Sequence, residues 1–295
     1  GEVLEGIRAA DSVLINTCAV SGVQVGTEKM WNYCKDHNMP MAFFINKMDR
    51  ENANFEKVLS QMKDKFGISV VPLHIPIGKE NDFKGIIDVV KMKAEMFDGN
   101  HIAEKDIPSE LLDMANGYKA EIMEVVAEND EELLEKYFSE GELSDEELIK
   151  GLRSGIAKGE IVPVFCGSGI VNKGITTLLD AIVDFMPCPS DVKPIYGKSV
   201  KDNEEVIRKV DVNEPFSAFV FKTIADPYVG KLSLFKVMSG SIASDTTAYN
   251  PDQGKNEKIG GLYVLKGKNQ IPVSKLIAGD IGAVSKLSIT ETGDT

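Results

Sequence analysis

The N-terminal part of the chain alternates between short apolar segments and stretches with helical periodicity. Residues 12–20 and 41–45 are mostly apolar or β-branched and have the length of a buried strand. After the second segment, apolar residues recur at i, i+3, i+4 and i+7 from Phe55, which places them on one face of a helix. Strands and helices in this alternating order predict a parallel sheet, so we expect this region to have an α/β fold.

The helical periodicity ends at a proline-containing sequence, Pro187-Cys188-Pro189, and a different pattern follows it. Before this sequence, residues 161–166 repeat the pattern of a buried strand. After it, strand-like runs are separated at short intervals by Gly, Pro, Asn and Asp, which is typical of an antiparallel β-barrel. These runs are residues 216–224, 232–238, 259–265 and 281–289. A chain of 295 residues has the length of two domains, and we expect the boundary near residue 190.

Acidic residues are concentrated in one segment of the chain. The formal net charge is −13, and residues 104–147 contain 16 acidic and 3 basic residues, so this segment carries the whole excess. Its apolar residues are spaced as in amphipathic helices, which places the carboxylates on the other faces. The rest of the chain is electrically balanced, so the composition does not exclude RNA contact, and the acidic segment favours a basic partner.

The sequence indicates neither membrane insertion nor secretion. No apolar run approaches the roughly 18 residues of a membrane-spanning helix, and no basic segment followed by an apolar one occurs at the N-terminus. Cys18, Cys34, Cys166 and Cys188 lack the close spacing of a zinc site and the density of a disulfide scaffold. We therefore expect a cytoplasmic protein without a metal site, a membrane partner or a DNA partner.

The sequence Asn46-Lys47-Met48-Asp49 follows the predicted strand 41–45 directly, at the end where open parallel sheets bind ligands. The Asp49 carboxylate can accept hydrogen bonds from both N1–H and the exocyclic amine of guanine. Adenine has neither donor on that edge and would leave the carboxylate unpaired. Lys47 can lay its methylene stem along the base, and the Asn46 amide can join neighbouring loops and reach the ring. These residues predict a guanine-binding site.

A second loop supports this prediction. Ser168 and Gly169 follow the predicted strand 161–166, and this strand belongs to the same region of the chain. Backbone N–H groups near Gly169 would complete the pocket if they point at the guanine carbonyl. The sequence Gly167-Ser168-Gly169 is by itself an ordinary turn, but its place after a buried strand makes it a candidate for the same site.

At these residues the chain resembles translational elongation factor G. Shared phrases extend over nearly the whole chain, at residues 46–50, 83–88, 166–168, 219–223 and 278–282. In that family Asn-Lys-x-Asp and the later Ser loop are the fourth and fifth guanine-nucleotide motifs, which implies nucleotide-binding roles for the residues named above. The family usually has Ala where this chain has Gly169. Backbone donors survive such a change, so recognition should persist with a more flexible loop.

The resemblance implies a partial Ras-like P-loop GTPase sheet with an inserted α/β subdomain, followed by an antiparallel β-barrel domain. The partial G domain would comprise residues 1–67 and 161–189, the acidic insert residues 68–160, and the second-domain β-barrel residues 190–295. The parent protein would be a GTPase that uses Mg²⁺, converts GTP to GDP and phosphate, and promotes ribosomal translocation of tRNA and mRNA. Its partners would be ribosomal RNA and the stalk protein, which the insert faces in this family.

The sequence lacks the phosphate-binding motif of a G domain. Gly197-Lys198-Ser199 resembles the end of a Gly-x-x-x-x-Gly-Lys-Ser/Thr loop but lacks the first glycine and lies beyond the predicted boundary. Asp82-Phe83-Lys84-Gly85 has the Asp-x-x-Gly pattern but follows Asn-Lys-x-Asp, which is the wrong order. The chain also starts at Gly1 without an initiator Met. We therefore expect an excised piece of a longer protein, without catalytic residues, metal ligands or GTPase activity of its own, that binds GDP weakly at best.

Two other functions are compatible with the sequence. A tetracycline-resistance ribosome-protection GTPase is built on related domains, although the insert and barrel phrases match elongation factor G more closely. A non-catalytic ribosome-binding module would act through the barrel and the acidic insert without nucleotide. The intact Asn-Lys-x-Asp sequence counts against this second alternative for the parent protein.

Overall fold

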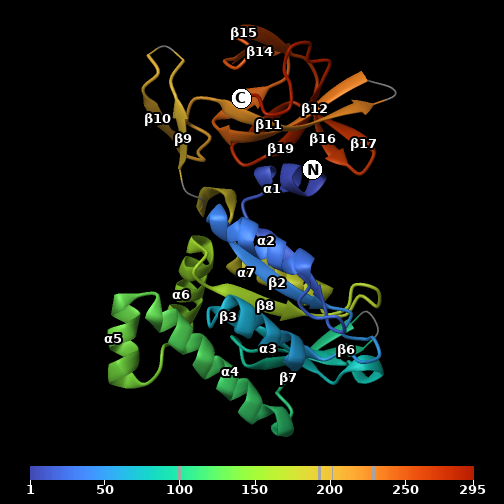
Figure 1. The fold of residues 1–295 in the computed structure, drawn as a ribbon, viewed down its shortest axis with the longest axis vertical. Coiled ribbons are helices and arrows are strands. Elements are labelled where there is room, and N and C mark those ends of the chain that lie inside the picture. Colours follow the sequence, from blue (N-terminus) through green and yellow to red (C-terminus); the bar gives the residue numbers. More distant parts are fainter. Residues whose placement is uncertain (99–100, 192–193, 201, 227–229) are drawn as a thin grey trace. The chain divides into compact units, whose positions relative to one another are not determined.

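The structure, a computed structural model, describes residues 1–98, 101–191, 194–200, 202–226 and 230–295 (Figure 1). The chain divides into two compact units. One unit is Ser12–Pro187, and the other combines Gly1–Asp11 with Cys188–Thr295. The sequence analysis grouped the first eleven residues with the partial G domain, whereas the structure groups them with the C-terminal unit.

The unit Ser12–Pro187 is built on a parallel sheet with the strand order β1-β2-β8-β3. The strands are β1 (Val13–Cys18), β2 (Met41–Asn46), β3 (Val70–Pro72) and β8 (Val162–Cys166), and each neighbouring pair is parallel. Because β2 and β8 are the central strands, both of their faces are covered and their sequences are almost entirely apolar. The predicted parallel α/β sheet is confirmed.

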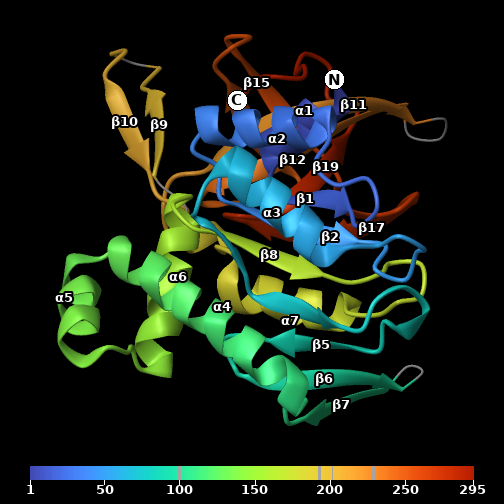
Figure 2. The same cartoon turned by 60° about the horizontal axis from the view of Figure 1, so that its bottom comes forward.

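Helices cover both faces of this sheet. α2 (Val25–Asp36) and α3 (Phe55–Phe66) lie on one side, and α7 (Ile175–Phe185) lies on the other (Figure 2). The apolar residues whose spacing predicted a helix form the buried side of α3. They are Phe55, Val58, Leu59 and Met62. The polar loops of residues 46–49 and 167–169 begin at the ends of β2 and β8.

The segment between β3 and β8 forms a second sheet and three helices. The sheet is antiparallel with the order β4-β5-β6-β7, and a short 3-10 helix, η1 (Glu80–Asp82), connects its first two strands. The strands are β4 (His74–Ile77), β5 (Gly85–Asp88), β6 (Lys93–Asp98) and β7 (His101–Lys105). The acidic residues lie mainly on α4 (Ser109–Glu128), α5 (Glu131–Glu140) and α6 (Asp145–Lys158), so the predicted amphipathic helices are present.

The C-terminal unit contains antiparallel sheets, as predicted. Its largest sheet has the order β11-β12-β19-β16-β17, and three two-stranded ladders pair β9 with β10, β13 with β18 and β14 with β15. The elements are η2 (Pro189–Asp191), β9 (Ile195–Lys198), β10 (Glu205–Arg208), β11 (Ser217–Asp226), β12 (Gly230–Ser239), β13 (Ser241–Ala243), β14 (Thr246–Asn250), β15 (Lys255–Ile259), β16 (Leu262–Lys266), β17 (Asn269–Val273), β18 (Lys275–Ile277) and β19 (Ile281–Ser285).

Ion pairs hold the N-terminal helix α1 (Glu2–Ala9) in this C-terminal unit. The Lys222 ammonium group lies 3.3 Å from a carboxylate oxygen of Glu5. The Lys236 side chain is buried and donates a hydrogen bond to Asp11, the last residue of the N-terminal segment. A buried ammonium group requires a charged partner, so this pair fixes the segment more firmly than an exposed pair would.

His74 is a buried titratable residue that the sequence analysis did not identify. Its ring packs edge-on against Phe165, with the ring centroids 4.9 Å apart, and its Nδ1 atom has no hydrogen-bond partner among the described residues. Burial lowers the pKa of His74 from 6.5 to about 4; the Asp88 carboxylate raises it less, and Lys91 lowers it further. The imidazole is therefore neutral in the folded protein at neutral pH.

We expect the free energy of unfolding of the unit Ser12–Pro187, which contains His74, to decrease as the pH falls from about 6.5 to about 4. In this range the unfolded chain binds a proton at His74 and the folded chain does not, and the pKa difference corresponds to about 3 kcal/mol. His74→Gln should lack this part of the pH dependence. Urea unfolding followed by the fluorescence of Trp31, the single tryptophan, measures it. The exposed His37→Gln is the control, and identical pH profiles for both variants would contradict the assignment.

Candidate functional site

Two polar loops meet at one edge of the parallel sheet because β2 and β8 are neighbours. The two strands are paired in parallel up to Ile45 and Cys166, so residues 46–49 and 167–169 leave the sheet side by side. The Met48 N–H donates a hydrogen bond of 3.1 Å to the Gly167 carbonyl and joins the loops directly. The carboxyl ends of parallel strands are the usual place for ligands in such sheets.

Asn46, the last residue of β2, connects the two loops through its side chain. Its Oδ1 atom accepts a hydrogen bond from the Lys47 N–H at 2.7 Å and another from the Gly169 N–H at 3.0 Å. The sequence analysis proposed that the Asn46 amide joins neighbouring loops, and the structure places it there. It also proposed that N–H groups near Gly169 point at a ligand. In the structure the N–H of Gly169 itself is bound to Asn46.

Asp49 and Ser168 are in direct contact although they come from different loops. The Ser168 hydroxyl donates a hydrogen bond to Asp49 Oδ1. Ser168 is fully buried, whereas Asp49 is half-buried. One oxygen of the carboxylate is thus held by a buried group, and no hydrogen bond from the described residues reaches the other oxygen. A carboxylate fixed on one side and open on the other can accept hydrogen bonds from a ligand.

Lys47 is the one exposed residue among the predicted recognition side chains of the 46–49 loop. Its backbone φ is 66°, a left-handed conformation that is unfavourable for a residue with a Cβ atom. The hydrogen bond from its N–H to Asn46 compensates for this conformation. The side chain leaves the loop on the solvent side, where its methylene stem is accessible to a flat ligand.

The second loop is closed by a residue that the sequence analysis missed. Ser168 and Lys173 exchange two backbone hydrogen bonds of 2.9 and 3.0 Å, so residues 168–173 form a compact turn. The Lys173 ammonium group donates to the Phe83 carbonyl at 2.5 Å, which ties this turn to the second sheet. No pattern around Lys173 indicates such a contact, because its partner is 90 residues away in the chain.

Cys18 ends the neighbouring strand β1 and lies opposite Asn46 in the register. Burial by itself raises the pKa of this thiol, but hydrogen bonds from Ser21 and Val20, with the charge of Lys47, lower it below its usual value. Lys47 is therefore close enough to influence the end of β1.

The described residues contain no group of three or more His, Cys, Asp or Glu side chains placed to hold a metal ion.

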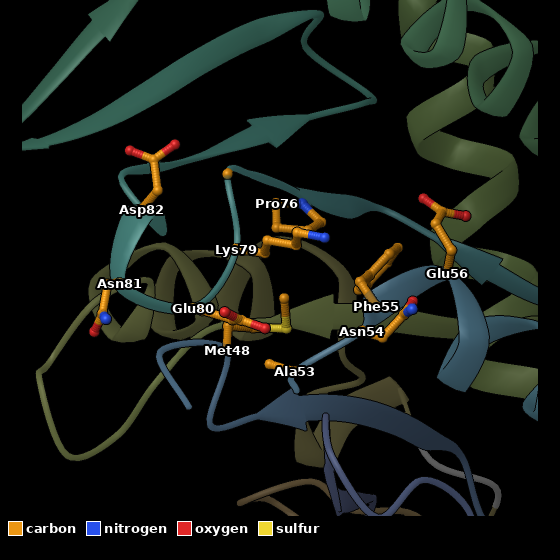
Figure 3. A pocket seen from close by; sticks show the side chains of 11 residues that line it. Met48, Ala53, Asn54, Phe55, Glu56, Pro76, Lys79, Glu80, Asn81 and Asp82 are labelled. Atoms are coloured by element: carbon orange, nitrogen blue, oxygen red, sulfur yellow. The ribbon is translucent and has the colours of Figure 1, made fainter. Parts of the chain in front are cut away.

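A pocket of about 780 Å³ lies next to the 46–49 loop (Figure 3). Its apolar lining includes Met48, Phe55 and Pro76, and its polar lining comes mainly from residues 78–82. Asn46, Lys47, Asp49 and Ser168 do not line it. The pocket is therefore separate from the predicted recognition side chains. Met48 lines the pocket and belongs to the same loop as Lys47 and Asp49.

Comparisons with known proteins cover almost the whole chain. The family model described as elongation factor Tu GTP binding domain matches residues 1–188, and the model described as elongation factor G domain 2 matches residues 215–295. A solved crystal structure of a protein from Thermus thermophilus is similar, with a TM-score of 0.84 and 26% sequence identity. The similarity covers 99% of this chain and 41% of that one, so this chain spans less than half the length of that protein.

No helix formed by the described residues has the length and apolar character needed to cross a membrane.

Proposed function

The chain belongs to the elongation factor G type of translation GTPases, and we propose that it is the guanine-recognition and second-domain portion of a ribosomal translocase. In this proposal the whole protein couples GTP hydrolysis to the movement of tRNA and mRNA on the ribosome. The match of residues 215–295 to domain 2 of elongation factor G supports a translocase over a tetracycline-resistance protein.

We assign guanine recognition to Asn46, Lys47, Asp49, Ser168 and Gly169. The observation that carries this assignment is the hydrogen bond from Ser168 to Asp49, because it orients a carboxylate with one oxygen open to a ligand. Guanine supplies two adjacent donors, N1–H and the 2-amino group, which match this carboxylate. The contacts of Asn46 hold the two loops at a constant separation, so the base would enter a preformed site.

We propose the same three domains as the sequence indicates. Residues 1–67 and 161–189 would be the partial G domain, although α1 packs in the C-terminal unit. Residues 68–160 would be the insert, whose acidic helices would face the ribosomal stalk protein. Residues 190–295 would be the second domain, and a cytoplasmic location agrees with the four cysteines being free thiols.

The sequence has no motif that would bind the phosphate groups of the guanine nucleotide. Catalysis of phosphoryl transfer depends on groups that surround the phosphates and Mg²⁺. Gly197 and Lys198 lie in β9 of the C-terminal unit, where they pair with β10, and Ser199 follows this strand. We therefore assign base recognition to this chain and no step of hydrolysis.

We expect the 295-residue chain to bind GDP selectively over ADP, because the proposed contacts are to the guanine base. The dissociation constant should be about 1 mM, because base contacts alone supply most of the affinity and the phosphate groups add little. Titration of the ¹⁵N-labelled chain, followed by NMR, measures this. GDP should shift the amide signals of Lys47 and Gly169, and ADP should not. Equal shifts with both nucleotides would contradict guanine recognition, and a submicromolar dissociation constant for GDP would contradict the absence of phosphate contacts.

A further inference from the structure

We propose that Glu80 is a positioning residue that braces the guanine-recognition loop, residues 46–52, from the second sheet. This inference deepens the proposed function and rests on it. The segment 78–83, which contains η1, lies in the insert and not in the parallel sheet. Its contacts with the recognition loops were not indicated by any sequence motif.

Glu80 binds the recognition loop at two points. Its backbone N–H donates a hydrogen bond of 2.9 Å to the carbonyl of Met48, within the Asn-Lys-x-Asp sequence. Its carboxylate accepts a hydrogen bond of 2.9 Å from the N–H of Asn52. The two contacts span the turn that contains Asp49, so Glu80 holds both sides of that turn.

The recognition loop needs such support because of its backbone conformation. Lys47 and Asn52 have φ values of 66° and 65°, and each left-handed residue raises the energy of the free loop by about 1 kcal/mol. Strained backbone persists where the surroundings hold it by several contacts. The contacts of Glu80 and Asn46 are those surroundings on the two sides of the loop.

The conformation of the segment 78–83 is itself fixed by a tight turn and by buried packing. Gly78 has a φ of 76°, and a Cβ atom there would lie 1.9 Å from the carbonyl oxygen of Asp82, so the turn accepts only glycine. Phe83 is fully buried and packs edge-on against Phe97, with the ring centroids 5.7 Å apart. A rigid turn anchored in the antiparallel sheet can therefore transmit that sheet's position to the loop.

The same segment also reaches the second recognition loop. The Phe83 carbonyl accepts the hydrogen bond from the Lys173 ammonium group, and this ammonium group lies 5.9 Å from the centre of the Phe83 ring. Lys173 closes the turn that presents Ser168. Both loops are thus held by one segment, which we infer sets the separation of Asp49 and Ser168.

Glu80→Ala tests the brace, and Asp82→Asn is the matched control, since the Asp82 carboxylate lies in the same segment but is exposed and pairs with Lys84 at 3.6 Å. In Glu80→Ala, amide hydrogen exchange of Asn52 should accelerate roughly tenfold, and that of Lys47 and Gly169 at least about threefold. The affinity for GDP should fall roughly five- to tenfold at an unchanged affinity for ADP. Glu80→Gln should retain most of both properties, because its side-chain oxygen still accepts from Asn52.

Faster exchange at Asn52 alone, with Lys47 and Gly169 as in Asp82→Asn, would show a local contact only and would overturn the proposal. An unchanged GDP affinity in Glu80→Ala would overturn it as well. If the unmodified chain shows no selectivity for guanine, the proposed function fails, and the exchange rates still decide whether Glu80 braces the loop. Urea unfolding of all variants identifies any general loss of stability.

Discussion

Replacement of Asp49 by Asn is expected to change the base preference of the chain from guanine to xanthine. In the proposed site the Asp49 carboxylate would accept from N1–H and the 2-amino group of guanine, whereas an amide would direct its N–H₂ group at that amine. Xanthine carries a carbonyl oxygen at this position and can accept from the new donor. Loss of a hydrogen bond to a charged group corresponds to about 2 kcal/mol, or roughly 30-fold in affinity.

The structure indicates that this variant will fold. The Ser168 hydroxyl can donate to the amide oxygen of Asn as it does to Asp49 Oδ1, so the joined loops should remain in place. NMR titrations with GDP and with xanthosine diphosphate measure the preference. Asp64→Asn, which removes an exposed carboxylate on α3, is the control and should still prefer GDP. A preference for GDP in Asp49→Asn would refute the role assigned to Asp49.

Replacement of Glu257 by Ala is expected to destabilise the C-terminal unit by about 4 kcal/mol. Glu257 on β15 is buried, and its carboxylate accepts hydrogen bonds from backbone or hydroxyl groups of three consecutive residues. These residues are Ser288, Ile289 and Thr290, with the Ile289 N–H at 3.0 Å and the Thr290 N–H at 3.1 Å. Removal of the carboxylate leaves several donors without an acceptor, which is among the most unfavourable changes in a protein interior.

Urea unfolding followed by circular dichroism and by the NMR signals of residues 288–290 measures this effect. Glu205→Ala, which removes an exposed carboxylate on β10 in the same unit, is the control. A difference below about 1 kcal/mol between the two variants would contradict the role of Glu257. Burial raises the pKa of Glu257, but the hydrogen bonds lower it more, so its stabilisation is present above pH 4.5 and is lost as the pH falls below that value.

The candidate site could be predicted in part because its chemistry is local. Asn46, Lys47 and Asp49 lie within four consecutive residues, and the apolar run before them indicates a strand end. The pairing of Asp49 with Ser168 could be expected only if the two buried strands were neighbours. Glu80 and Lys173 could not be found, since neither belongs to a motif and both act on backbone atoms.

The same distinction applies to the whole chain. Apolar periodicity and side-chain chemistry depend on neighbouring residues. The sequence alone therefore determined the parallel and antiparallel regions, and it was sufficient to propose guanine as the base that Asp49 would recognise. The strand order, the place of residues 1–11 in the C-terminal unit and the brace at Glu80 were decided only by the tertiary structure. A hydrogen bond requires atoms about 3 Å apart, and for Ser168 and Asp49, separated by 119 residues, only the packing of β8 beside β2 provides that distance.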